Sequence, residues 1–218
     1  MAKTLQIDFV SDVACPWCAV GLGALERAAE NLRGEIELDL HFQPFELNPQ
    51  MAPEGEDADE HLQRKYGRTK EQFAAARATI RERGAAVGFT FGERTRIWNT
   101  FDAHRLLHWA GLEGAAQQHA LKSALLQAYH GDGRNPSDPE VLAAVAASVG
   151  LNEARAREIL QGDEFADAVR AQEQHWQQLG INSVPAVVIN QRHLISGGQP
   201  PEVFEQALRE IAAASASA

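Results

Sequence analysis

Two cysteines, Cys15 and Cys18, are the residues of this chain best suited to chemistry, and the chain has no others. Residues three apart on one helical face are neighbours, close enough for a disulfide with little backbone change. A thiolate is the attacking species in disulfide exchange. The segment Cys-Pro-Trp-Cys therefore predicts a redox pair, with Cys15 as the nucleophile and Cys18 as the resolving thiol.

The elements around the pair support this interpretation. Before it, Leu5, Ile7 and Phe9 alternate with polar residues as in a half-buried strand, and after it apolar residues recur at helical spacing. Where a strand is followed directly by a helix, the free backbone N–H groups of the first helical turn and the helix dipole favour negative charge. Cys15 should therefore ionise more easily than a free thiol. Pro16 suits a first helical turn, where its missing N–H is not needed.

The main alternative for two such cysteines is half of a zinc site. A structural zinc site needs two further ligands, usually at similar spacing, and the chain has no second cysteine pair. The eight histidines do not cluster at metal-ligand spacings. We therefore expect no metal and no cofactor beyond the redox disulfide itself, and two cysteines exclude a disulfide scaffold.

The composition argues against other classes of function. A net charge of −10 is unlike a nucleic-acid binder, which normally carries a basic patch. No apolar run reaches the length needed to span a bilayer, and the segment MAKTLQIDF lacks the layout of a secretion signal. We expect no membrane association and a cytoplasmic location.

The strands predicted from the pattern lie at the two ends of the chain. Residues 36–42 alternate strictly between apolar and polar, which makes strand, helix and strand a βαβ unit with parallel strands. Two short apolar runs at 186–189 and 194–195 predict a hairpin joined at Asn190 and Gln191, and a closing helix follows over 201–211.

Residues 57–179 have a helical pattern almost throughout. The expected helices cover 59–66, 69–87, 100–109, 115–129, 139–149, 153–160 and 163–179, with an exposed loop at 54–59 and an irregular connector at 89–97. We therefore predict a small sheet built from both chain ends, with a helical domain inserted between them. The expected parts are 1–55 with the βαβ unit, 56–179 as the inserted domain, 180–212 with the hairpin and last helix, and a disordered tail at 213–218.

Several stretches of the chain resemble the FrnE-like subgroup of the DsbA-family oxidoreductases. They span essentially the whole chain and read SDVACPWC, PFELNP, AHRLL, HGDGRNPSDPEVL, GINSVPAVVIN and SGGQPPEVFEQAL. The resemblance implies an α/β thioredoxin fold with a large all-helical insertion, and a thiol–disulfide oxidoreductase or isomerase. The chain departs from the subgroup after CPWC, where it has AVGL and the subgroup often has an aromatic residue first and a basic residue fourth.

Pro185 follows Val184 just before a late strand. Spacing alone leaves a cis and a trans bond equally open, because proline is also tolerated as the first residue of a strand. The resemblance implies the cis form. A tight turn there would leave the backbone N–H and C=O of Val184 free beside Cys15, where a substrate segment can pair in extended form.

Three further residues are candidates for the site. Trp17 is expected to be partly exposed as an apolar platform for substrate, and the dipeptide Pro16-Trp17 is expected to influence the redox potential. Asp12, three residues before Cys15, could influence thiol protonation or cap the helix, and the sequence leaves both roles open. His104, together with Asn99, is placed in the cleft between the sheet and the insertion.

Three functions are compatible with these residues. The first is a thiol–disulfide oxidoreductase that acts on protein or small thiol substrates. The second is a glutathione-dependent isomerase or transferase, because the DsbA branch also resembles kappa-class glutathione transferases and hydroxychromene-carboxylate isomerases. Those typically carry a serine near position 15 and an Asp-Arg pair where this chain has Gly197-Gly198-Gln199-Pro200. The third is a non-catalytic module or chaperone that holds unfolded chains. Glutathione is open as a co-substrate, and the oligomeric state is open between monomer and homodimer.

Overall fold

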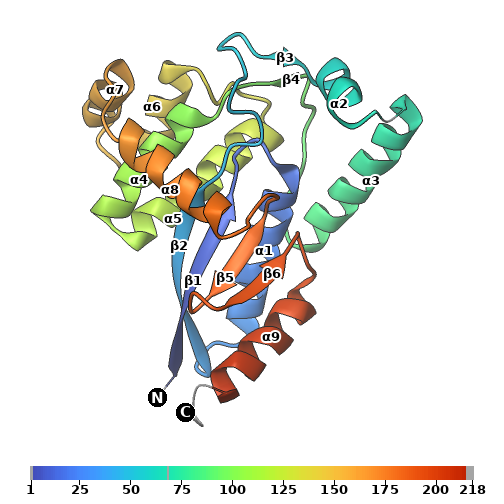
Figure 1. Ribbon diagram of the computed structural model, residues 1–218, viewed down its shortest axis with the longest axis vertical. Coiled ribbons are helices and arrows are strands. Elements are labelled where there is room, and N and C mark those ends of the chain that lie inside the picture. The colour runs from blue at the N-terminus through green and yellow to red at the C-terminus, as the bar shows by residue number, and fades with distance from the viewer. Residues whose placement is uncertain (1, 68, 215–218) are drawn as a thin grey trace.

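The main sheet of the protein is assembled from both ends of the chain. The computed structural model describes residues 2–67 and 69–214. The sheet has the order β2-β1-β5-β6, with β1 (Lys3–Ser11), β2 (Ile36–Pro44), β5 (Ala186–Ile189) and β6 (His193–Ser196). β1 and β2 are parallel, whereas β5 is antiparallel to both β1 and β6. The helices inserted between β2 and β5 confirm the predicted thioredoxin fold with a helical insertion (Figure 1).

β1 is buried more deeply than its half-buried pattern predicted. Phe9, Val10 and Ser11 are all 0% exposed. The reason is that β1 lies in the middle of the sheet, with helices over both faces. α1 (Pro16–Asn31) and α9 (Pro201–Ala214) pack together on the far face in Figure 1, and α8 (Ala166–Gln178) crosses the near face beside β2.

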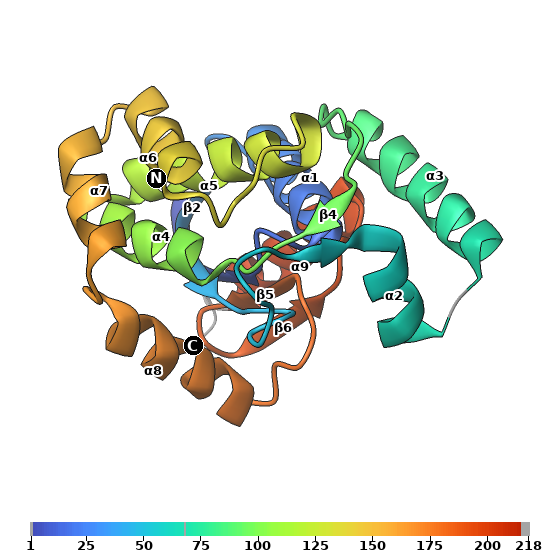
Figure 2. The same ribbon diagram turned by 90° about the horizontal axis from the view of Figure 1, so that it is seen from above.

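The insertion forms two groups of helices on opposite sides of the sheet (Figure 2). On one side is a pair that we call the arm, α2 (Ala58–Tyr66) and α3 (Lys70–Ala86). On the other side lie α4 (Phe101–Glu113), α5 (Ala115–Leu126), α6 (Pro139–Ser148) and α7 (Glu153–Gln161). A two-stranded antiparallel ribbon, β3 (Glu56–Asp57) with β4 (Arg96–Ile97), lies where the arm joins the rest of the chain. The expected loop at 54–59 and irregular connector at 89–97 therefore each contain a short strand.

Polar caps define several helix starts. Asp138 accepts a hydrogen bond from the Glu140 N–H ahead of Pro139, and Asn152 caps α7 in the same way. Three boundaries differ from the expectation. α4 continues through Gly111, α8 starts at Ala166 rather than at Asp163, and α5 ends at Leu126, where the π-helical turn η1 (Gln127–Gly131) begins.

The end of the chain is more helical than expected. Residues 213–214, assigned from the sequence to a disordered tail, belong to the last turn of α9. The remaining residues of that expected tail, 215–218, lie outside the described part of the chain. The boundaries at 55/56 and 179/180 stay predictions. Within the described residues, no helix is both long enough and apolar enough to cross a membrane.

Candidate active site

Cys15 sits at the start of α1, where the strand-to-helix pattern predicts it. It is the N-cap residue, and Pro16 is the first residue of the helix. The backbone N–H of Cys18 donates a hydrogen bond of 3.0 Å to the Cys15 carbonyl. Both thiols are free in the structure. Cys15 is only 4% exposed and Cys18 is 0% exposed, so the nucleophile is less open to solvent than the sequence suggested.

The two thiols have opposite electrostatic environments. The hydrogen bond from the Cys18 thiol lowers the pKa of Cys15 against the effect of burial, and the backbone N–H groups of Cys18 and Trp17 lower it further. Burial raises the pKa of Cys18 well above its ordinary value, and its contact with Cys15 adds to this. Cys15 is therefore the thiol that ionises first.

The Val184–Pro185 bond is cis and lies beside Cys15. The Cys15 thiol donates a hydrogen bond of 3.5 Å to the Val184 carbonyl. Gly21, on α1, permits this approach, because a Cβ at that position would lie 3.0 Å from Pro185 Cγ. The structure thus brings together Cys15, Val184 and Pro185 as the family resemblance implied.

Asp12 fixes the loop before Cys15 and does not cap α1. It is 0% exposed. Its Oδ1 accepts hydrogen bonds from the Ala14 N–H (3.0 Å) and the Thr100 hydroxyl (2.7 Å), and its Oδ2 accepts one from the Leu47 N–H (2.7 Å). Burial would raise the pKa of Asp12, but the neighbouring His104 imidazole and the two backbone N–H groups hold it below its ordinary value. The charge of Asp12 raises the pKa of Cys15, which favours the role in thiol protonation.

His104 lies between the sheet and the insertion, as expected, but it lines a small buried pocket beside β2 and not the cavity at Cys15. It is 2% exposed, and its Nε2 lies 3.5 Å from Asp12 Oδ1. The side chain of Asn99 forms hydrogen bonds with backbone groups. Its Nδ2 donates to the Met51 carbonyl (3.4 Å), and its Oδ1 accepts from the Phe101 N–H (2.8 Å). His104 therefore packs against the Asp12 carboxylate in the interior of the protein.

Residues of the insertion form hydrogen bonds with the backbone carbonyls of Val13 and Ala14, which follow Asp12 in the loop before Cys15. His130 Nε2 lies 2.8 Å from the Val13 carbonyl, and Arg94 Nη1 donates a 3.1 Å hydrogen bond to the Ala14 carbonyl. Burial, followed by the charge of Arg94, lowers the pKa of His130 to about 3. The imidazole is therefore neutral at pH 7, and because a carbonyl only accepts, its Nε2 carries the hydrogen.

Lys122 supplies a cation that α1 lacks after CPWC. It lies on α5 and is 1% exposed. Its charge opposes the rise in the pKa of Cys18, and burial in turn lowers the pKa of Lys122 itself. One helical turn earlier, Gln118 bonds to the Phe42 N–H (3.0 Å) and carbonyl (3.2 Å), which anchors α5 on β2. A single lysine in an Ala-rich helix looks like a surface residue, so no sequence pattern indicates its role.

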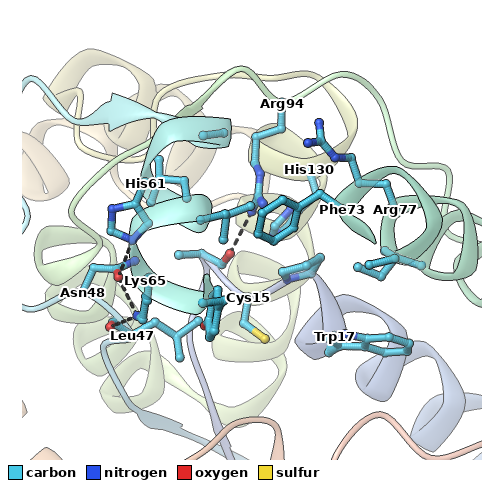
Figure 3. A pocket seen from close by; sticks show the side chains of 18 of the residues that line it. Cys15, Trp17, Leu47, Asn48, His61, Lys65, Phe73, Arg77, Arg94 and His130 are labelled. Atoms are coloured by element: carbon cyan, nitrogen blue, oxygen red, sulfur yellow. Dashed lines mark hydrogen bonds between the residues drawn. The ribbon is translucent and has the colours of Figure 1, made fainter. Parts of the chain in front are cut away.

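A cavity of about 860 Å³ opens at Cys15 (Figure 3). One wall carries Cys15, Pro16, Trp17 and residues 182–184, and the opposing walls come from residues 45–48, from α2 and α3, and from residues 91–95 with His130. Trp17 is half-buried and lines the cavity, as expected for an apolar platform. The cavity places Cys15 within reach of a bound molecule.

Comparisons with known proteins agree with this architecture. A family model described as DSBA-like thioredoxin domain matches residues 6–209. The chain is similar to a crystal structure of a probable DsbA oxidoreductase from Streptomyces coelicolor, with 34% identity and a TM-score of 0.86, covering 94% of this chain and 89% of that one.

Two more distant structures share the fold. A 2-hydroxychromene-2-carboxylate isomerase has 14% identity and a TM-score of 0.74, covering 97% of this chain and 98% of that one. The cytosolic disulfide reductase DsbM from Pseudomonas aeruginosa, solved with GSH, has 18% identity and a TM-score of 0.62, covering 94% of this chain and 98% of that one.

Proposed function

The chain belongs to the DSBA-like thioredoxin domain family, and from this premise we propose that it is a thiol–disulfide oxidoreductase that works through Cys15 and Cys18. The observation that supports the proposal most is the contrast between the two thiols. Cys15 lines the cavity with a lowered pKa, whereas Cys18 is fully buried behind it with a raised pKa. This is the division expected of an attacking thiol and a resolving thiol.

The proposed reaction has two exchange steps. The Cys15 thiolate attacks one sulfur of a substrate disulfide, a Cys15–substrate disulfide forms, and the other substrate sulfur leaves as a thiolate. Cys18 then loses its proton and attacks Cys15 Sγ, which closes the Cys15–Cys18 disulfide and releases the second substrate thiolate. The substrate disulfide is reduced by two electrons and the cysteine pair is oxidised; the reverse sequence oxidises a dithiol.

In this proposal the surrounding residues bind substrate and position the thiols. Trp17 offers an apolar surface, and Val184 with Pro185 offers backbone groups to an extended segment beside Cys15. Pro16 and Asp12 hold the start of α1, and His104 supports Asp12. We assign the chain to the FrnE-like subgroup on its sequence stretches. A cytoplasmic location is also part of the proposal, and the fold shared with a cytosolic disulfide reductase supports it.

Single-cysteine variants test the proposal. Cys15→Ser should abolish reduction of disulfides, because no attacking thiol remains, whereas Cys18→Ser should accumulate a mixed disulfide on Cys15. Non-reducing gels and intact mass measure both outcomes. Equal residual activity of the two variants would show that the roles are wrong.

A glutathione-dependent isomerase is the second candidate, and its support is the fold shared with 2-hydroxychromene-2-carboxylate isomerase. Such an enzyme would use the cavity to hold glutathione and would not need a redox pair. Isomerisation or conjugation activity retained in Cys15→Ser would favour this candidate. Loss of all activity in Cys15→Ser favours the oxidoreductase.

A further inference from the structure

The inner face of α3 is amphipathic and faces a cavity rather than protein. Phe73, Ala76, Arg77, Ile80 and Arg81 follow the three- and four-residue spacing of one helical face, and all five line the cavity at Cys15. Of the residues of α3, all of which the structure describes, only Phe73 and Gly84 are buried. A helix normally packs its apolar stripe on the core, so a stripe left facing a cavity is suited to contact a ligand.

Positive charge gathers on this cavity although the chain as a whole carries −10. Lys65, Arg77, Arg81 and Arg94 line it, and among the described lining residues the carboxylates are those of Glu46 and Glu93. Lys65 donates to the Leu47 carbonyl (2.7 Å) and to Asn48 Oδ1 (2.8 Å), and its ammonium lies 5.7 Å from the centre of the Tyr66 ring.

The two arginines of α3 that line the cavity, Arg77 and Arg81, differ in whether an ion pair neutralises them. Arg77 pairs with Asp59 from α2. Arg81 is exposed and forms no ion pair within the described part of the chain. In Figure 3, Arg77 and Arg94 lie on the side of the cavity across from Cys15 and Trp17. A molecule bound at Cys15 therefore faces these two cations across the cavity.

The cavity has the size of a small-molecule site. Its volume of about 860 Å³ falls within the roughly 300–1,000 Å³ typical of ligand pockets. Apolar side chains of Trp17, Leu62, Phe73 and Ile80 line the same cavity. The arrangement fits a compact molecule with a sulfur at one end and acidic groups at the other.

We propose that the cavity selects low-molecular-weight disulfides that carry carboxylate or phosphate groups, with the disulfide at Cys15 and the anionic groups at Arg77 and Arg81. The inference rests on the proposed oxidoreductase function and names its substrate class. In the reaction, Cys15 forms a mixed disulfide with one half of the substrate, the other half leaves as a thiolate, and Cys18 then releases the first half.

The test compares disulfides of different charge, each rate being divided by the rate of the same disulfide with a small free thiol, because the pKa of the leaving thiol also affects the rate. The reduced protein is mixed with glutathione disulfide, which is anionic, with neutral 2-hydroxyethyl disulfide and with cationic cystamine, and loss of protein thiols is followed in a stopped flow. Glutathione disulfide should react fastest and cystamine slowest. The advantage should shrink as salt is added, because exposed charges are screened.

A double variant, Arg77→Gln with Arg81→Gln, connects the preference to α3. It should lower the ratio of the rate constants for glutathione disulfide and 2-hydroxyethyl disulfide by about tenfold, since two exposed charge contacts with the substrate are lost together. Losing Arg77 also leaves the Asp59 carboxylate unpaired nearby. Arg33→Gln is the control, because it removes an exposed arginine that follows α1 and does not line the cavity.

The outcomes distinguish a failure of this inference from a failure of the proposed oxidoreductase function. Exchange with none of the disulfides overturns the proposed function together with the inference. Exchange at equal rates with all three overturns the inference alone, as does a double variant that behaves like Arg33→Gln. Faster reaction with an unfolded disulfide-bonded protein than with glutathione disulfide also overturns it, because the arm would then accommodate a chain.

Discussion

At the scale of single residues, the pKa of Cys15 depends first on its neighbour in the motif. The hydrogen bond from the Cys18 thiol is the largest cause of the lowered pKa. Cys18→Ala removes this donor, and Cys18→Ser replaces it with a hydroxyl. We expect the pKa of Cys15 to move back toward its ordinary value in Cys18→Ala and to stay lower in Cys18→Ser. The pH dependence of iodoacetamide alkylation, read by intact mass, measures both. A Cys18→Ala protein that ionises as readily as the parent contradicts this cause.

Lys122 should act on the resolving thiol. Because its charge lowers the pKa of Cys18, Lys122→Met should raise that pKa and slow the release of the mixed disulfide by about tenfold or more, the effect of roughly 1.4 kcal/mol. The pH dependence of Cys18 alkylation in a Cys15→Ser background measures the pKa of Cys18. Quenched-flow analysis of the mixed disulfide measures its rate of release.

The stability of this variant separates an electrostatic role from a packing role. Replacing a buried charge with an apolar side chain is often neutral or stabilising, so Lys122→Met should unfold at no lower urea concentration than the parent. Lys70→Met, at the exposed start of α3, serves as the control. An unchanged alkylation profile of Cys18 would show that Lys122 does not affect the pKa of Cys18.

At the scale of elements, the π-helical turn η1 makes the loop before Cys15 sensitive to acid. His130 is buried with a pKa lowered from 6.5 to about 3. Its folded pKa lies below the unfolded one, so its contribution to stability is complete above pH 6.5 and is lost as the pH falls toward the folded pKa. One such group steepens the loss of unfolding free energy by up to about 1.4 kcal/mol per pH unit.

His130→Gln tests this acid dependence. Glutamine keeps a neutral N–H donor for the Val13 carbonyl but does not titrate. The free energy of unfolding in urea should therefore fall less steeply between pH 6.5 and 4.5 in the variant than in the parent. Equal slopes for both proteins would exclude His130 as a source of the acid sensitivity.

The sequence predicted the regular helices and strands, and it missed features that depend on contacts between segments distant in the chain. Alternation at 36–42 is a local signal, and it predicted the strand β2. The two-residue strands β3 and β4 are too short to alternate, and a π-helical turn has no periodicity of its own. These features appear only when distant segments meet.

The same limit applies to the site. The spacing of Cys15 and Cys18 predicted the motif, because both belong to one helix. Arg94, Lys122 and His130 come from other elements and have no sequence link to the motif. His104 is buried and not open to the cavity at Cys15, because α4 is buried on several sides, with residues 103–107 all buried in succession. Its periodicity therefore did not show which residues face the cleft.

At the scale of the whole molecule, the two parts of the insertion differ in how they are held. One hydrophobic cluster combines Val13 and Ala14 with side chains of α4 to α7, so these helices pack directly on the loop before Cys15. In the arm, by contrast, α2 buries Ala58 and His61, and α3 buries Phe73 and Gly84. Opening of the arm should therefore cost much less free energy than global unfolding.

Native-state hydrogen exchange tests this difference. Amides of α2 and the first half of α3 should exchange faster than those of α4 and α5 by about two orders of magnitude or more, which corresponds to roughly 3 kcal/mol or more in opening free energy. Mass spectrometry of peptic fragments resolves the segments. Similar protection in the arm and in α4 would show that the arm is held as firmly as the core.

The division of the cavity between a firmly packed wall and the arm has a consequence for evolution and engineering. The reacting thiols lie in the core, while the inner positions of α3 contribute little to it. Substitutions at positions 76, 77, 80 and 81 should therefore have little effect on folding, but they should change the contacts made by a molecule bound in the cavity. A library randomised at those four codons should retain mostly folded, redox-competent members, and new specificities can be selected from it without redesigning the chemistry.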